Sequence, residues 1–479
     1  SATSVPHPCG RAGEAAGGAA ATATAAGSAG AGDRPDVVTP GRHDDERATT
    51  RAVVIPPPAS HVRRTVLPGG LRVVTDAVPG GPSTTIAVWV GVGGRDEPDA
   101  DAGASHFLEH LLFKGTAERS ATDIAFEVDG MGGDMNAYTT SEYTAYHVRV
   151  PAPEVDAATD LLLEVVRRPA LRPEELEGER GVILEELAAA DDDPEDVVGV
   201  RLHAALFPDH PLGRDVLGER RTIEALTRER VAGFFDRWYR PANLVVTAAG
   251  GIDHDRLVAR VAEAFDGVEP GARPVRTPPG DPSRVWTGRH HATDLVHLAL
   301  GWRIPESLVP DRFALAVANQ VLGSGPASRL FQEVRERRAL TYSIASGVSL
   351  YQDAGTWTLQ CSTSPDKAPE VLTVVQDLVR GLAAEGITDE ELVRARRSLR
   401  GSLLLGLEDS GHRAARLGVA ECVRGRYTPV EEHLERLDAV TSESVAHLAR
   451  EVLGRPGVVS VVAPEGADLA ALRGLVPGA

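Results

Sequence analysis

The sequence GASHFLEHLLFKGT, residues 103–116, decides how the rest of the chain is interpreted. On a helix each residue advances by about 100°, so His106, Glu109 and His110 fall within one face. Two imidazoles four positions apart can both reach one Zn²⁺, and Glu109 lies beside the metal, where a general base acts. Leucines and a phenylalanine fill the remaining arc. The stretch predicts a helix with one buried face and one metal-binding face; the competing explanation is a helix with two chance histidines.

A catalytic zinc site usually has three protein ligands, and an acidic helix predicted over 173–190 offers the third. Glu179 and Glu186 are seven positions apart and share a helix face. We expect Glu186 to be the ligand and Glu179 to orient a ligand. Glu185 points about 100° away and is the alternative ligand. The simpler explanation of these acids is a helix face in solvent.

Composition limits the classes of function. Of the 479 residues, 42% are apolar and 25% are charged, as in ordinary globular proteins. The net charge of −19 argues against nucleic acid or an anionic membrane as a partner. The three cysteines are far apart, and no apolar run reaches the roughly 18 residues of a membrane-spanning helix. We expect a protein of a reducing compartment, the cytoplasm, with the mitochondrial matrix as the alternative location.

Four segments are distinguished along the chain. Residues 1–58, rich in Ala and Gly, are expected to form a disordered arm. Residues 59–270 are expected to form the zinc-binding catalytic domain, 271–290 a linker rich in Pro and Gly, and 291–479 a second domain. Strand and helix patterns come in runs, which predicts an α+β fold with antiparallel-rich sheets and covering helices. The clearest patterns are a hairpin over 65–74, strands over 84–92, 244–249 and 295–302, and helices over 102–114, 121–131, 154–168, 173–190, 195–206, 223–238, 254–266 and 310–323.

A short internal repeat supports two homologous halves. Residues 223–227 read IEALT and residues 437–441 read LDAVT. Each precedes a predicted helix, then an Arg-Pro pair and an apolar strand, at an offset of 214 to 215 residues. Duplication of a unit of about 200 residues is the simplest account.

The inverted order His-x-x-Glu-His is the inverzincin signature. With its flanking residues it resembles the pitrilysin-like metallopeptidases, in particular the mitochondrial processing peptidase branch and its bacterial relatives. The family's third ligand is a glutamate about 76 residues beyond the second histidine, which is the spacing of Glu186 from His110. In the family another acid precedes that ligand by seven positions, as Glu179 does here.

Two further segments resemble the family. GGDMNAYTT, residues 132–140, is similar to its edge strand, where Asn136 and Ala137 would meet the substrate main chain. Residues 328–342 are similar to its Arg/Tyr motif, with Arg335 and Tyr342 seven positions apart. The family's usual Gly-Leu-Ala-Tyr reads ALTY here, which leaves the local turn geometry open.

The resemblance implies a zinc metalloendopeptidase with one Zn²⁺ per chain, held by His106, His110 and Glu186. Glu109 would take a proton from water and deliver it to the leaving amine. Tyr342 would donate to the developing oxyanion and Arg335 would fix the substrate main chain. The substrate would be an extended peptide or a leader or targeting sequence.

The resemblance also implies that the two halves form one half of a clamshell chamber, completed by a homodimer or by a heterodimer with a homologous subunit. The alternative is a non-catalytic structural or partner subunit, which the completeness of the motifs disfavours. Acidic residues such as Glu142 and those at 191–193 would favour basic peptides, or would simply form a solvated face.

Overall fold

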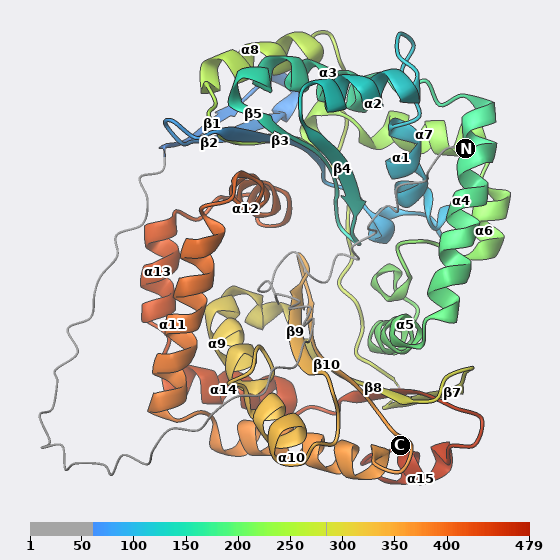
Figure 1. The fold of residues 1–479 in the computed structure, drawn as a ribbon, viewed down its shortest axis with the longest axis vertical. Coiled ribbons are helices and arrows are strands. Elements are labelled where there is room, and N and C mark those ends of the chain that lie inside the picture. Colours follow the sequence, from blue (N-terminus) through green and yellow to red (C-terminus); the bar gives the residue numbers. More distant parts are fainter. Residues whose placement is uncertain (1–60, 284) are drawn as a thin grey trace, which may run out of the picture.

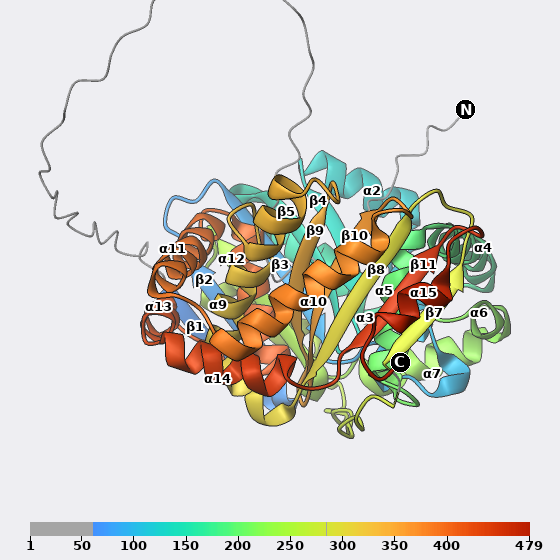
Figure 2. The same ribbon diagram turned by 90° about the horizontal axis from the view of Figure 1, so that it is seen from below.

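A computed structural model describes residues 61–283 and 285–479, so the arm expected at 1–58 lies outside the described residues. The fold is α+β, as expected, with one mixed sheet in each half and helices around both (Figure 1). In the view turned by 90°, the helices of the second half cover its sheet from below (Figure 2). Within the described ranges, no helix combines the length and the apolar character needed to cross a membrane.

The first sheet has the strand order β1-β2-β6-β3-β5-β4. The expected hairpin at 65–74 is the antiparallel pair of β1 and β2, and β2 continues the sheet parallel to β6. The edge of the sheet is β4, which pairs with β5 alone. The strand bounds are β1 (His61–Val66), β2 (Arg72–Ala77), β3 (Ser83–Val90), β4 (Asp134–Thr139), β5 (Thr144–Pro151) and β6 (Leu244–Gly250).

The second sheet repeats five of these strands in the order β7-β11-β8-β10-β9. The β7–β11 pair is parallel, like β2–β6, and the other pairs are antiparallel. Residues 286–290, which the sequence suggested as the end of a linker, form β7. The bounds are β7 (Trp286–His290), β8 (Val296–Ile304), β9 (Ile344–Leu350), β10 (Gly355–Thr363) and β11 (Val458–Ala463).

Helices connect and cover the strands in both halves. In the first half they are α1 (Ala104–Leu112), α2 (Ala121–Gly130), α3 (Val155–Arg167), α4 (Pro173–Asp192), α5 (Pro194–Leu206), α6 (Arg220–Ala225), α7 (Arg228–Trp238) and α8 (His254–Ala264). In the second half they are α9 (Arg312–Leu322), the π-helix η8 (Phe331–Arg337), α10 (Ala368–Glu385), α11 (Asp389–Gly406), α12 (Ser410–Val423), α13 (Val430–Asp438), α14 (Ser442–Leu453) and α15 (Leu469–Gly474).

The single helix predicted over 223–238 is instead two helices. Leu226 is extended and Thr227 accepts a hydrogen bond from the backbone N–H of Arg230, so α7 begins anew after α6. In the equivalent place of the second half, Thr441 caps α14 through Ser444. The repeated sequence therefore encodes a repeated helix cap followed by a central strand.

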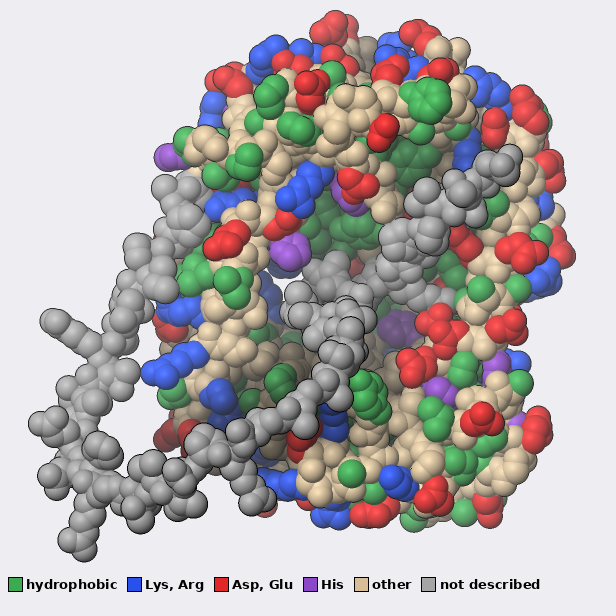
Figure 3. All heavy atoms as spheres, viewed as in Figure 1, with side chains coloured by type: hydrophobic (Ala, Val, Ile, Leu, Met, Phe, Trp, Pro, Cys, Tyr) green, Lys and Arg blue, Asp and Glu red, His purple; other side chains and the backbone are tan. Residues whose placement is uncertain are grey.

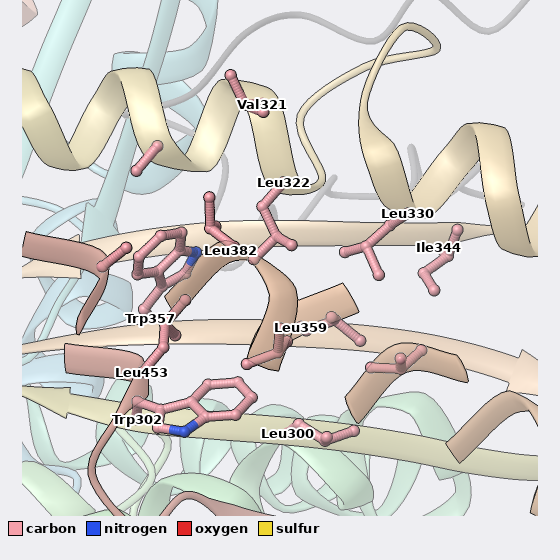
Figure 4. Packing of buried hydrophobic residues seen from close by; sticks show 14 of the residues in the cluster. Leu300, Trp302, Val321, Leu322, Leu330, Ile344, Trp357, Leu359, Leu382 and Leu453 are labelled. Carbon is pink, nitrogen blue, oxygen red and sulfur yellow. The ribbon is translucent and has the colours of Figure 1, made fainter. Parts of the chain in front are cut away.

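Each half has its own apolar core between its sheet and its outer helices. In the second half, Trp302 and Trp357 project from β8 and β10 toward Leu322 of α9 and Leu453 of α14 (Figure 4). Side chains of this size dominate the stabilisation that comes from burying apolar surface. The cores hold the sheets firmly enough to position side chains at the strand ends.

Two helices pack against the sheet of the opposite half. Helix α5 lies on β8 and β11, whereas α12 lies on β3 and β6. Leu417 of α12 packs with Trp89, and a Cβ at Gly418 would lie only 1.9 Å from the Trp89 ring. Arg413 forms a buried ion pair of 2.7 Å with Asp76. The two halves are therefore interlocked, and the space-filling view is hollowed between them (Figure 3).

Candidate metal centre

The metal-binding motif lies on α1, whose apolar face is buried as the sequence predicts. The helix begins after Gly103, which has a φ of 96° and leaves no room for a side chain because a Cβ would lie 2.5 Å from Ile223. Glu97 accepts the backbone N–H of Gly103 at 2.8 Å and that of Ser105 at 2.7 Å. These contacts fix the start of the helix and the direction in which His106 projects.

The three expected ligands meet at one point between α1 and α4. The Nε2 atoms of His106 and His110 are 3.3 Å apart, and Glu186 Oε2 lies 3.6 Å from the first and 3.5 Å from the second. Ligands about 2.0–2.2 Å from one tetrahedral zinc ion lie roughly 3.3–3.5 Å apart. The triangle therefore has the dimensions of a zinc ligand set.

The environment of Glu186 also fits a metal ligand. Its Oε2 is buried and accepts no hydrogen bond from the described residues. A buried carboxylate oxygen is costly unless hydrogen-bonded or bound to a metal. The group of His106, His110 and Glu186 is the one set of potential ligands found among residues 61–283 and 285–479, and Glu185 is exposed and outside it.

Glu179 lies behind the ligands rather than among them. Its Oε2 is 3.0 Å from His110 Nδ1 and its Oε1 is 2.7 Å from Lys114 Nζ. Burial raises the pKa of Glu179, but these two partners outweigh it and hold the pKa below its ordinary value. An ionised Glu179 fixes the tautomer of His110 with Nε2 free to bind metal.

The electrostatic environment favours positive charge at the centre of the triangle. Burial lowers the pKa of His110, but the hydrogen bond to Glu179 and the nearby Glu186 raise it to about 9. Burial raises the pKa of Glu186, but the two imidazoles outweigh it and the pKa lies below its ordinary value. A divalent cation would supply the positive charge that these carboxylates favour.

Glu109 lies on the same helix and is held from the first sheet. Thr139, the last residue of β4, donates its hydroxyl to Glu109 Oε2 at 2.6 Å. Burial raises the pKa of the Glu109 carboxyl above its ordinary value, and the hydrogen bond from Thr139 opposes that shift. One carboxylate oxygen is thus anchored by a hydroxyl donor in a largely buried setting.

Asn136 and Ala137 lie on edge strand β4, where they pair with His147 and Tyr146 of β5. Asn136 Oδ1 accepts the N–H of Ala137 at 2.8 Å. The opposite side of β4 has no neighbouring strand in the described sheet. An unpaired strand edge is a ready template for an extended peptide.

Arg335 and Tyr342 lie in the second half, Arg335 in η8 and Tyr342 just before β9. The Arg335 guanidinium stacks on the Tyr342 ring, 5.0 Å from its centre, and on Phe331 at 4.5 Å. The Tyr342 side chain is 85% exposed. The described contacts of this pair lie in the second half and do not reach the metal ligands.

The structure overturns one suggestion about charge. The Glu142 side chain is only 4% exposed and pairs with Arg95 at 2.6 Å. A buried, paired carboxylate does not attract basic peptides from solution. The other acidic residues suggested for that role, residues 191–193, lie where α4 ends and α5 begins.

Three residues that support the site were not assigned a role from the sequence: Glu97, Lys114 and Thr139. Lys114 lies four positions after His110, so its closeness to the same helix face was available from spacing. Glu97 precedes the helix by several residues and Thr139 lies 30 residues from Glu109, so their contacts depend on the folded chain.

Two family models match the chain. One, described as Insulinase (Peptidase family M16), covers residues 72–220 and so includes α1 and α4. The other, described as Peptidase M16 inactive domain, covers residues 225–399. The second half lacks a His-x-x-Glu-His motif, in keeping with that description.

Relatives match over most of their length. An uncharacterized zinc protease of Mycobacterium tuberculosis is 43% identical over 426 residues, covering 87% of this chain and 96% of the relative. An uncharacterized zinc protease of Streptomyces coelicolor is 41% identical, and the match covers 84% of this chain and 90% of the relative. One of Bacillus subtilis is 32% identical, and the match covers 85% of this chain and 99% of the relative.

Solved structures share the fold. A protease from Helicobacter pylori superposes with a TM-score of 0.79 at 22% identity, covering 85% of this chain and 100% of that one. A peptidase M16 inactive domain from Pseudomonas fluorescens gives 0.78 at 22% identity, covering 85% and 99%. The superpositions show a shared fold, whereas the sequence matches show membership of a family. The resemblance inferred from residues 103–116 is confirmed: the chain belongs to peptidase family M16, the insulinase family, and its relatives bear the name zinc protease.

Proposed function

We propose that the protein is a zinc-dependent endopeptidase that cleaves extended peptides. The observation that carries this proposal is the triangle of His106, His110 and Glu186, with sides of 3.3, 3.5 and 3.6 Å. Glu109 belongs to the same helix as the two histidines and is held in place by Thr139. Ligands and base together form the minimum set for metal-assisted hydrolysis.

The chain's own residues have distinct parts in the reaction. Zn²⁺, when bound, would polarise the scissile carbonyl and lower the pKa of a water molecule. Glu179 keeps a proton on His110 Nδ1, so that His110 Nε2 faces the metal position. Glu109 receives the proton of the attacking water and passes it to the leaving amine nitrogen. Thr139 restrains one Glu109 oxygen and leaves the other for the proton.

The edge of β4 is the natural place for the substrate main chain. A peptide that adds to this edge as a further strand would pass Asn136 and Ala137 and end near Thr139 and Glu109. Main-chain hydrogen bonds bring the scissile bond to the base while tolerating varied side chains. This mode suits a processing enzyme acting on leader or targeting sequences.

Arg335 and Tyr342 suit contacts with a substrate held by another subunit. They are stacked together, and Tyr342 is largely exposed rather than packed onto the metal ligands of its own chain. In a homodimer, Tyr342 of one copy would donate to the oxyanion at the zinc site of the other, and Arg335 would bind main-chain carbonyls. A heterodimer with a homologous subunit is the alternative assembly.

Glu109→Gln tests the proposal because it removes the base and leaves the ligands unchanged. The variant should retain wild-type zinc content by elemental analysis and lose about 10²- to 10⁴-fold in kcat on a quenched-peptide library. Glu185→Gln, an exposed change on α4, is the matched control and should keep full activity. Equal cleavage by wild type and Glu109→Gln would refute this proposal, whereas no cleavage by the zinc-loaded wild type would favour the non-catalytic partner role.

A further inference from the structure

A buried cluster of five charged side chains joins the two halves of the molecule. Arg95 and Asp96 follow β3, Glu142 lies in the turn between β4 and β5, Arg276 in the connection between the halves, and Asp353 in the turn between β9 and β10. Their side chains are between 2% and 10% exposed. Charges buried to this degree are tolerated only when they are well paired.

Arg95 bridges the two turns directly. Its two terminal nitrogens lie 2.7 Å from the two oxygens of Asp353, and Nη1 also lies 2.6 Å from Glu142 Oε1. The backbone N–H of Gln352 donates to Glu142 Oε2 at 3.0 Å. The turn of the second half is thus attached to Glu142 by a shared guanidinium and by one direct hydrogen bond.

Arg276 closes the cluster from the connecting segment. Its guanidinium lies 2.8 and 2.7 Å from the two oxygens of Asp96. It also donates to the backbone carbonyl of Glu142 at 2.7 Å. Three chain segments therefore converge on the β4–β5 turn. One follows β3 of the first sheet, one is the connection between the halves, and one is the β9–β10 turn of the second half.

The two bridged turns are equivalent in the two sheets. The strand orders β6-β3-β5-β4 and β11-β8-β10-β9 correspond, so the β4–β5 turn of the first half matches the β9–β10 turn of the second. Through this contact between equivalent turns, the second half can influence the position of the β4–β5 hairpin, whose strand β4 is the proposed substrate-binding edge. The hairpin also contains Thr139, three residues before Glu142.

The β4–β5 turn is held rigidly, so a shift of the turn would also move the end of β4. Gly94 N donates to Thr140 O at 3.1 Å and Arg95 N to Ser141 O at 2.7 Å. A Cβ on Gly93 would lie 2.1 Å from Thr140 O, so this close approach requires glycine. A turn held on its backbone and by the Glu142 side chain has little freedom to shift relative to β4.

We propose that Asp353 is a positioning residue for peptide hydrolysis: through Arg95 and Glu142 it fixes the end of β4, and with it Thr139 and the Glu109 carboxylate. The second half thereby contributes to the zinc site of its own chain, separately from any contact that Arg335 and Tyr342 make. This inference rests on the proposed peptidase function for its kinetic consequences. Its structural content, the control of β4 by Asp353, stands on the cluster alone.

A double-mutant cycle between Asp353→Asn and Thr139→Val tests the proposal on kcat per bound zinc. A displacement on the order of 1 Å at a reacting group costs up to about 100-fold in rate, and we expect about a tenfold loss of kcat from each single change. The double variant should be no slower than Thr139→Val alone, because the effect of Asp353 passes through the Thr139 hydroxyl. Thr139→Ser keeps the hydroxyl and should restore the sensitivity to Asp353→Asn.

The control is Asp255→Asn, which breaks the exposed pair of Asp255 with Arg63 and should leave kcat unchanged. Multiplicative losses in the double variant, or an unchanged kcat in Asp353→Asn, would overturn the proposal. Should Asp353→Asn not fold, Asp353→Glu keeps the charge and displaces the carboxylate. It should give a smaller loss that also vanishes in the Thr139→Val background; a loss that persists there would overturn the proposal.

Hydrogen exchange separates this proposal from the proposed function. Asp353→Asn should speed backbone exchange within residues 134–143 while the exchange of α3 and α8 stays as in the wild type. This measurement holds even if the wild type cleaves no peptide, in which case the peptidase proposal fails and the positioning of β4 is still decided. Unchanged exchange at 134–143 would overturn the inference.

Discussion

The Glu97 carboxylate accepts the backbone N–H of Ser105, the residue immediately before His106, the first of the proposed metal ligands. The same carboxylate accepts the N–H of Gly103, so both of its oxygens are used at the start of α1. Burial raises the pKa of Glu97 to about 7, and the two backbone N–H groups oppose that rise because they favour the charged carboxylate. Glu97 is 5% exposed, so water does not replace these bonds when they are lost.

We predict that Glu97→Gln weakens zinc binding and destabilises the fold. The glutamine amide places N–H groups against a backbone N–H donor, which leaves buried groups unpaired at a cost of about 1–3 kcal/mol. Zinc affinity, measured by competition with a chromogenic chelator, should fall about tenfold as the ligand helix loses its anchor. Glu118→Gln, an exposed change beyond the same helix, should alter neither quantity. Unchanged zinc affinity in Glu97→Gln would contradict this role.

Loss of the Glu179 charge should act on His110 rather than on the metal directly. In Glu179→Gln the group facing His110 Nδ1 is a weaker acceptor, and zinc affinity should fall about 10- to 100-fold. Lys114→Met should change affinity in the same direction but less, because Lys114 pairs with Glu179 and acts on His110 through it. Glu177→Gln is the control on the same helix, since Glu177 is 67% exposed and pairs with Arg180. Equal affinities in Glu177→Gln and Glu179→Gln would refute the orienting role.

Mixing two inactive variants should reveal whether sites are shared between copies. Tyr342→Phe removes the proposed oxyanion donor and should lower kcat about 10²-fold, as Glu109→Gln does through loss of the base. In a homodimer with exchanged contributions, an equimolar mixture should recover about one quarter of wild-type activity after subunit exchange. No recovery, with exchange confirmed by native mass spectrometry, would mean that Tyr342 serves its own chain or a different partner.

Acid should destabilise the fold through buried histidines. Burial, together with nearby Arg303, lowers the pKa of His203 to about 4, whereas the unfolded chain titrates near 6.5. Between these values the unfolded state binds the proton, so stability falls as the pH drops from about 6.5 to 4 and levels off below. His203→Gln should remove about 3 kcal/mol of this loss in urea unfolding compared at pH 7 and pH 4, at roughly 1.36 kcal/mol for each pKa unit. The exposed His412→Gln serves as the control; an equal pH dependence in all three proteins would disprove the assignment.

The sequence predicted the parts of the site that lie within one helix. Spacing alone placed His106, Glu109 and His110 on one face of α1, and the same periodicity paired Glu179 with Glu186 on α4. Both groupings depend only on the helical repeat, which is a local property. That the two helices meet at a common point was inferred from the three ligands that a catalytic zinc site needs and from the resemblance to a family, not from periodicity.

Contacts across the sheet could not be predicted in this way. The hydrogen bond between Thr139 and Glu109 joins the end of a strand to a helix, and it depends on strand register. Glu142 was interpreted as a surface charge because its partners, Arg95 and the backbone N–H of Gln352, are 47 and 210 positions away. The sequence predicted a helix over 195–206, the position of α5, but none over α12, and an amphipathic pattern does not say against which sheet a helix packs.

The exchange of α5 and α12 between the halves bears on how the protein is made. Among the described residues, helix α12 (residues 410–423) covers the face of the first sheet that carries Trp89, so this face stays open until residue 423 has left the ribosome. At roughly 5–20 residues per second, this leaves an apolar surface in water for many seconds of translation. A fragment truncated near residue 270 would keep that surface permanently, and we expect it to require a chaperone or to precipitate.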